Sequence, residues 1–254
     1  MKAAVTAREV AEALTALRDD AQAAHLMRFF KTGPGQYGEG DRFLGLKVPV
    51  TRAVVRQARQ AVALPEISTL LHSPWHEVRL AGFLLLVEEM KTVLPKRSDT
   101  PQRSSAKAER RRELAEFYLA HATHANNWDL VDLSCEYILG PYLRLDCNAD
   151  IAPLRRLASS ANLWEQRIAV VTTLDFIRNG IFAPTLELAD RLMNHPHDLI
   201  HKAVGWTLRE VGKRDRDVLT DYLERNCTRM PRTALRYAIE HYPAHERTAW
   251  LKRR

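Results

Sequence analysis

The sequence predicts an all-α protein, a HEAT-like α-solenoid of antiparallel helix pairs with a concave basic groove. Helix-forming segments follow one another along the chain, and no convincing run of alternating apolar and polar residues interrupts them. Similar short sequence motifs recur near the start of the second helix of several pairs. In addition, 35 residues separate Asp132 from Arg167 and Arg167 from Lys202. A period in this range, made only of helix pairs, is typical of helical-repeat proteins.

Composition limits the class of protein. The chain has 254 residues, of which 46% are hydrophobic and 27% charged, so it belongs with soluble globular proteins rather than disordered ones. Its net charge of +7 favours a polyanionic partner, with nucleic acid ahead of a membrane surface. Three cysteines without CxxC spacing argue against a disulfide scaffold or a structural zinc site. With no signal-peptide pattern and no membrane-length apolar run, we expect a cytoplasmic protein.

The first part of the chain reads as one helix over residues 6–31, followed by a glycine-rich loop over residues 33–40. This loop lacks the Gly-Lys-Ser/Thr ending of a phosphate-binding P-loop, which excludes that type of nucleotide triphosphate site. The segment Phe43-Leu44-Gly45-Leu46-Lys47-Val48-Pro49 then leads into another helix.

The rest of the chain reads as helix after helix within a single repeat domain, residues 1–254. Pro65 opens a short helix, and Ser73-Pro74 begins the next, which runs to about Met90. A polar insertion follows at about residues 91–112, and its basic second half fits either a nucleic-acid arm or a solvated helix face. Further helices are expected at residues 109–122, 128–143, 151–159, 163–179, 184–194, 199–213, 216–225 and 232–241.

The most distinctive stretch starts at Asn126-Asn127-Trp128. Asparagine can cap a helix start, and Asp129 suits the positive end of the helix dipole. Trp128 and Asp132 are four residues apart and therefore share a face, along an acidic stripe with Asp129 and Glu136. Spacing alone favours a solvated acidic face beside a partly buried tryptophan.

Two further features concern cations. Arg167 lies in a helix that is apolar nearly all round, so it is either buried with a partner such as Asp132 or reaches solvent along its apolar stem. Trp206 shares a face with Lys202, Arg209 and Lys213. That face suits nucleic acid, with cations meeting phosphates and the indole meeting a sugar or base. The alternative is a boundary tryptophan under long basic side chains.

Several histidines lack the spacing of metal ligands, so we expect surface or capping histidines and neither a metal nor a cofactor. They are His72, His76, His195, His197 and His201. The sequence also lacks Gly-x-Ser-x-Gly, so it gives no signal of a nucleophile-elbow hydrolase.

The chain from about Met27 to Tyr242 resembles the AlkD-like DNA alkylation repair glycosylases, which are built from HEAT-like repeats. The matching segments are residues 28–33, 43–49, 127–132, 164–167 and 202–210. The resemblance implies a monomeric DNA glycosylase acting in base excision repair. Such an enzyme excises positively charged alkylated purines, such as 3-methyladenine and 7-methylguanine, from duplex DNA without flipping them into a pocket. It also implies the core of the site: Trp128, Asp132 and Trp206 in catalysis, with Arg167 holding a phosphate or Asp132 itself. Together with Arg167, we expect DNA binding by Lys202, Arg209 and Lys213 on the face around Trp206, and by Lys47.

The residue types suit this chemistry. Breaking the N-glycosidic bond leaves positive charge on the sugar, which a carboxylate such as Asp132 can stabilise while it orients a water. Tryptophans can hold a cationic nucleotide by cation–π contacts. One position departs from the family: Leu26 stands where characterised members carry a tyrosine, and Phe29, Phe30 or Tyr37 are candidates to replace it. The alternatives are a non-catalytic binder of damaged or branched DNA with the same fold, and a helical-repeat protein scaffold.

Overall fold

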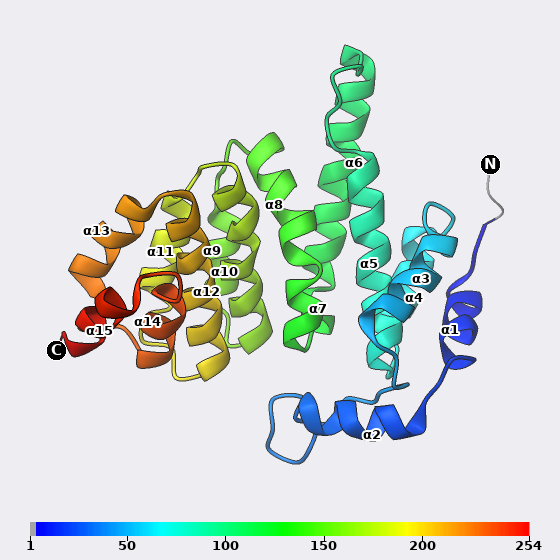
Figure 1. The fold of residues 1–254 in the computed structure, drawn as a ribbon. Coiled ribbons are helices and arrows are strands. Elements are labelled where there is room, and N and C mark those ends of the chain that lie inside the picture. Colours follow the sequence, from blue (N-terminus) through cyan, green and yellow to red (C-terminus); the bar gives the residue numbers. More distant parts are fainter. Residues whose placement is uncertain (1–3, 254) are drawn as a thin grey trace. The chain divides into compact units, whose positions relative to one another are not determined.

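All regular elements in the described part of the chain are helices, apart from one isolated β-bridge between Arg42 and Trp75. The structure is a computed structural model that describes residues 4–253. Its contacts divide the chain into two compact units, Met1–Ile138 and Leu139–Arg254 (Figure 1). The all-α, solenoid-like fold expected from the sequence is thereby confirmed. The prediction of one repeat domain with an insertion at residues 91–112 stays a prediction.

The first unit is built around one apolar helix, α5, His76–Thr92. Residues 76–87 of this helix are all buried, and they include the polar or charged side chains of His76, Glu77 and Arg79. Helices from before and after it in the chain pack on α5: α1 (Ala7–Thr15), α3 (Val48–Ala58), α4 (Leu64–Leu71), α6 (Pro101–Ala120) and α7 (Trp128–Asp132). A short 3-10 turn, Ala122–His124, precedes α7, and α8 spans Cys135–Asp146.

The prediction of one helix over residues 6–31 is wrong, because the chain breaks between α1 and α2 (Asp20–Phe29). The Asp19 carboxylate caps α2 by accepting from the Gln22 backbone N–H at 2.9 Å, and the Asp19 N–H donates to the Leu44 carbonyl at 2.9 Å. Gly45 makes this approach possible. Its φ is +91°, and a Cβ there would lie 2.0 Å from the Asp19 carbonyl oxygen. The break is therefore fixed by a contact with a distant segment.

The basic stretch after residue 100 is helical from Pro101 onward, with Thr100 as the N-cap of α6. The helix thus starts eight residues before the expected position. Lys107 Nζ lies 2.7 Å from Asp99 Oδ2 and 3.1 Å from the Leu94 carbonyl oxygen, and Arg111 is buried and donates to the Val93 carbonyl at 2.6 Å. These contacts favour the helix-face alternative over a free nucleic-acid arm.

The second unit is a row of paired helices. Within it α10 (Leu163–Arg178), α12 (Asp198–Arg214) and α14 (Arg232–Ala238) pack side by side. The helices α9 (Ala152–Ala158) and α11 (Ala183–Arg191) pack on α10, and α11 and α13 (Arg216–Asn226) pack on α12. These bounds agree with the sequence-based helices to within a few residues. The final helix, α15 (Ala244–Lys252), was not among them.

None of the helices in residues 4–253 combines the length and the apolar character needed to cross a membrane.

Candidate functional site

Trp128 and Asp132 open and close α7, a helix of only five residues. The Asn127 side chain caps it by accepting from the Trp128 backbone N–H at 2.9 Å. Both Trp128 and Asp132 are half-buried. The expected continuous helix over residues 128–143 is wrong, because a short break at Leu133–Ser134 separates α7 from α8. The short helix therefore presents its tryptophan and its aspartate one turn apart.

The indole of Trp128 is one end of a column of four stacked rings. Trp128 stacks on Phe30 with 5.1 Å between ring centroids, and Phe30 stacks on Phe43 at 5.0 Å. Phe43 in turn stacks on the imidazole of His76 at 4.3 Å. The planes within each of these three successive pairs are within 22° of one another, and Phe30 also contacts the His76 ring directly, at 5.1 Å and 41°. The column thus joins the half-buried indole to a histidine in the core.

His76 is buried between two aspartates. Its Nδ1 atom lies 2.8 Å from Asp41 Oδ2, its Nε2 atom lies 2.9 Å from Asp129 Oδ2, and Arg79 pairs with the other Asp41 oxygen at 2.6 Å. A neutral imidazole has only one N–H, so a ring with both nitrogens against carboxylates is protonated. Burial alone would lower the pKa of His76, but Asp129 and Asp41 raise it to about 9. Burial opposes ionisation of Asp41 too, yet His76 and Arg79 hold its pKa below the usual range.

Two sequence-based interpretations are corrected by this cluster. The acidic stripe is not a solvated face, because Asp129 and Glu136 are both buried while Asp132 is half-buried. His76 is not a surface or capping histidine, although His197 does cap α12 by accepting from the Leu199 N–H at 3.1 Å. The missed signal was the position of His76 just before the long apolar run of α5, where a polar ring needs buried partners.

Histidines outside this cluster contact other protein groups. No group of three or more His, Cys, Asp or Glu side chains within residues 4–253 could hold a metal ion. His195 Nε2 lies 2.8 Å from the Gln166 side-chain oxygen, and His72 Nδ1 lies 2.7 Å from the Ser68 carbonyl oxygen.

Aromatic residues at the end of α2 surround Trp128 in different ways. Leu26, where the resemblance implies a tyrosine, is partly buried and packs against the same apolar cluster as Trp128. Phe30 is buried under the indole, whereas Phe29 is 56% exposed and meets the indole edge-on at 6.0 Å. Tyr37 is half-buried. Among the three candidates to replace the tyrosine, Phe29 therefore combines exposure with contact to Trp128.

The second unit holds most of the expected DNA-binding residues. Arg167 on α10 is buried, as one alternative expected, and it donates to the Leu199 carbonyl at 2.6 Å. Its pairing with Asp132 stays a prediction. The cations on α12 contact carboxylates. Lys202 Nζ lies 2.8 Å from Asp198, and Lys213 Nζ lies 2.8 Å from Glu210.

The remaining residues of the α12 face are Trp206 and Arg209. Trp206 is half-buried, and Arg209 forms an ion pair with Glu240. This is the basic, tryptophan-containing face expected from the sequence, with part of its charge neutralised by neighbouring carboxylates.

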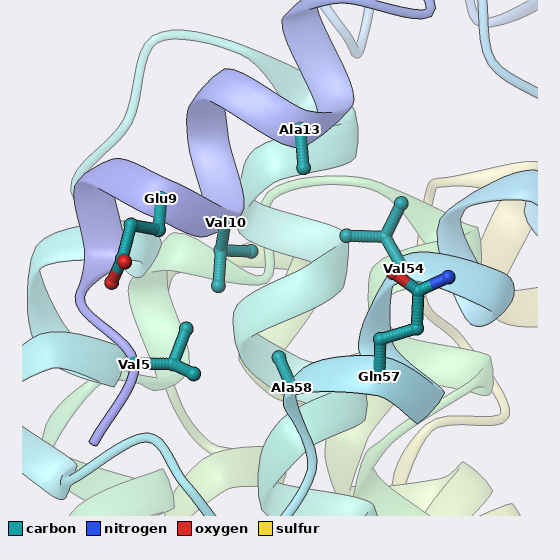
Figure 2. A pocket seen from close by; sticks show the side chains of 7 residues that line it. All are labelled: Val5, Glu9, Val10, Ala13, Val54, Gln57 and Ala58. Carbon is teal, nitrogen blue, oxygen red and sulfur yellow. The ribbon is translucent and has the colours of Figure 1, made fainter. Parts of the chain in front are cut away.

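A hollow of about 220 Å³ lies elsewhere in the first unit, between α1 and α3 (Figure 2). Its lining is mostly apolar, and the carboxylate of Glu9 is used in a capping box with Thr6. The lining residues are Val5, Glu9, Val10, Ala13, Val54, Gln57 and Ala58. None of them is an expected site residue, so this hollow has no part in the candidate site.

Comparison with known proteins decides the family. The family model for DNA alkylation repair enzymes matches residues 10–242. The chain belongs to the DNA alkylation repair enzyme family. It is similar in fold to a solved structure described as a predicted DNA alkylation repair enzyme from Enterococcus faecalis, with a TM-score of 0.64 and 15% sequence identity. The similarity covers 89% of this chain and 97% of that one. No curated protein matches this chain.

In this DNA alkylation repair family member, the expected site residues are divided between the two units. Lys47, Trp128 and Asp132 belong to the first unit, and Arg167, Lys202, Trp206, Arg209 and Lys213 belong to the second. That they line one concave basic groove stays a prediction.

Proposed function

We propose that this family member is a DNA glycosylase that removes positively charged N-alkylated purines, such as 3-methyladenine and 7-methylguanine, from duplex DNA. One observation carries the proposal. A half-buried tryptophan, seated on a column of aromatic rings, and a half-buried aspartate lie one turn apart on the same short helix. A π-face and a carboxylate at this spacing suit a substrate whose positive charge moves from the base to the sugar.

In the proposed reaction the bond between the sugar C1′ and the purine nitrogen breaks, and its electron pair neutralises the cationic base as it leaves. No general acid is needed, because the base is already a cation. Asp132 stabilises the positive charge that develops on the sugar and orients a water, whose oxygen forms the new bond to C1′ as one of its protons is lost to solvent. Trp128 holds the cationic nucleotide by a cation–π contact, which contributes about 0.5–2 kcal/mol, and the family resemblance implies a like role for Trp206.

In this proposal the basic residues of the second unit bind phosphates of the DNA backbone. Phosphates would take the place of Asp198 and Glu210 as partners of Lys202 and Lys213, with release of counterions from the DNA. Arg167 is held against the start of α12 through the Leu199 carbonyl, so it would act from a fixed position.

A second candidate function is non-catalytic binding of damaged or branched DNA. Leu26 favours it, because this apolar side chain, which packs against the same core cluster as Trp128, stands where the resemblance implies a tyrosine. Such a protein would recognise distorted DNA through the same aromatic and basic groups without excising a base.

The deciding experiment measures release of 7-methylguanine from methylated duplex DNA at excess protein. Asp132→Asn is expected to slow release by about 100-fold or more, as loss of a charge-stabilising group does in other enzymes, while DNA affinity is kept. Asp217→Asn, at an exposed position on α13, is the matched control and should release base at the wild-type rate. If the wild-type protein binds the DNA but releases nothing, the non-catalytic function holds instead. Failure to bind at all would contradict both functions.

A further inference from the structure

We propose that His76 is a positioning residue: as a buried imidazolium it holds α7 through Asp129 and holds the Trp128 indole through the ring column. This inference rests on the proposed glycosylase function for its consequence in catalysis. It adds a residue that lies three ring contacts from Trp128 in the order His76, Phe43, Phe30, Trp128, and two contacts away through the direct approach of His76 to Phe30.

The first argument is the shortness of α7. A helix of five residues is not stable by itself, because nucleation fixes several residues for one hydrogen bond. Trp128, Asp129 and Asp132 all lie on it. Its orientation must therefore be set by contacts with other elements, and the ion pair from Asp129 to His76 is a buried contact of this kind with α5.

The second argument is the geometry of the Asp129 carboxylate. Its Oδ1 atom accepts from the Leu130 backbone N–H at 2.9 Å, and its Oδ2 atom lies 2.9 Å from His76 Nε2. Both oxygens are engaged, so rotation of the carboxylate would break a hydrogen bond at a site without access to water. A buried polar group left without its partner costs about 1–3 kcal/mol.

The third argument is that His76 joins three separate segments. It belongs to α5, its Nδ1 atom contacts Asp41, and its backbone N–H donates to the Arg42 carbonyl at 2.7 Å. Its ring also stacks on Phe43 in the same segment. The imidazolium thus fixes the segment that carries Phe43 on one side and α7 on the other. Both of these parts support Trp128: Phe43 stacks on Phe30, which stacks on the indole, and α7 carries Trp128 itself.

The charges of the cluster balance only when His76 is protonated. Asp41 and Asp129 supply two negative charges, and His76 and Arg79 supply two positive ones. The other charged group next to His76 on α5, Glu77, accepts hydrogen bonds from the backbone N–H groups of Leu44, Gly45 and Leu46. Deprotonation of His76 would set a nitrogen lone pair against one carboxylate and leave a buried negative charge uncompensated.

The first test follows Trp128 directly. In protein labelled with 5-fluorotryptophan, the ¹⁹F resonance of Trp128, assigned with Trp128→Phe, should shift with a midpoint near pH 9. The resonance of Trp250, on α15 of the second unit, should not follow that midpoint. In His76→Gln the shift of the Trp128 resonance near pH 9 should disappear. A Trp128 resonance that is flat through pH 9 in the wild type, or that titrates unchanged in His76→Gln, overturns the proposal.

The second test separates positioning from stability. With excess protein, His76→Gln should release 7-methylguanine about 10- to 100-fold more slowly, as expected for a displaced catalytic geometry, with DNA affinity within twofold of wild type. His245→Gln, at an exposed position on α15, is the matched control and should behave like wild type. If His76→Gln remains folded and releases base at the wild-type rate, the positioning role is excluded.

The failure of this proposal can be distinguished from misfolding of the variant and from failure of the glycosylase function. If His76→Gln does not fold, the wild-type fluorine titration still decides, and Asp129→Asn provides a second variant of the same contact. If the wild-type protein releases no base, the glycosylase function fails, whereas the dependence of Trp128 on His76 is still read from the fluorine spectra.

Discussion

The indole of Trp128 stacks face to face on the ring of Phe30, with 5.1 Å between centroids and 17° between planes. The residue before it, Phe29, meets the same indole edge-on at 6.0 Å and 73°. Phe30 is 7% exposed and Phe29 is 56% exposed. Two consecutive phenylalanines therefore differ in role: one supports the indole from the core, and the other extends the aromatic surface toward solvent.

This difference predicts that truncating Phe30 lowers stability, whereas truncating Phe29 weakens DNA binding. Phe30→Ala should lower the free energy of unfolding by about 3–5 kcal/mol, because it leaves a cavity under Trp128. Phe29→Ala should change it by about 0.5 kcal/mol or less, since an exposed ring loses little on truncation. Phe29→Ala should instead weaken binding to methylated DNA by about 1–3 kcal/mol, the value for one base or sugar stacked on an aromatic ring.

Urea unfolding measures the first effect, and titration with DNA at one fixed salt concentration measures the second. If Phe29→Ala binds methylated DNA as tightly as the wild type, the exposed ring does not contact the nucleic acid.

The buried imidazolium predicts a pH dependence of stability. The pKa of His76 is about 9 in the folded protein, whereas an unperturbed histidine has a pKa of 6.5. Because the folded pKa is the higher one, the stabilisation is fully present below about pH 6.5. It declines as pH rises and is lost above about pH 9. At about 1.36 kcal/mol per unit, the contribution is about 3 kcal/mol.

The measurement is the free energy of unfolding in urea at pH 6, 7.5 and 9.5. The wild type should lose stability across this series, and His76→Gln should lose about 3 kcal/mol less over the same range. Equal slopes in the two proteins would mean that His76 does not carry the proton assigned to it.

Two lysines predict different contributions to DNA binding. Lys47 is exposed at the start of α3, and no ion pair to it is found among the described residues, whereas Lys107 is held by Asp99. Lys47→Ala should reduce the slope of log affinity against log salt by about one, as expected for the loss of one phosphate contact. Lys107→Ala, the matched control, should leave the slope unchanged. A larger loss of slope in Lys107→Ala would restore the nucleic-acid arm as the explanation of the basic stretch.

The sequence was sufficient to predict helix type and helix order. Apolar periodicity located α10, α12 and the helices that pack on them. Each of these helices buries either one apolar face or its whole surface, and both leave a recognisable pattern of apolar residues. It could not locate the break before Asp20, since that break is fixed by the Leu44 carbonyl and by the φ of Gly45. Local pattern carries no information about a contact with a segment 25 residues away.

The candidate site was predictable only in part, for the same reason. The spacing of Trp128 and Asp132 placed both on one helix face, and the structure keeps them on α7. The partner of Asp129 lies 53 residues earlier in the chain, so the spacing that suggested a solvated acidic stripe could not reveal it. The sequence did contain one indication of buried partners, which was the free-energy cost of burying charged side chains. His76 and Glu77 precede a long apolar run on α5, and charges buried there require partners.

Glu77 provides the last prediction, because its carboxylate organises the segment between α2 and α3. It accepts from the backbone N–H groups of Leu44, Gly45 and Leu46 at 2.8, 2.9 and 3.0 Å, and it is 1% exposed. Glu77→Gln keeps the shape but turns one acceptor into a donor that faces an N–H. We expect a loss of about 2–4 kcal/mol in the free energy of unfolding, the range for a buried charged acceptor and an unsatisfied donor.

The effect should also be local. Hydrogen exchange of the three amides should accelerate, and so should that of the Asp19 amide, which donates to the Leu44 carbonyl. Glu116→Gln, at an exposed position on α6, is the matched control and should change neither stability nor exchange. If the amides of residues 44–46 stay protected in Glu77→Gln, their protection comes from the packing of the segment, and the carboxylate is not what holds it.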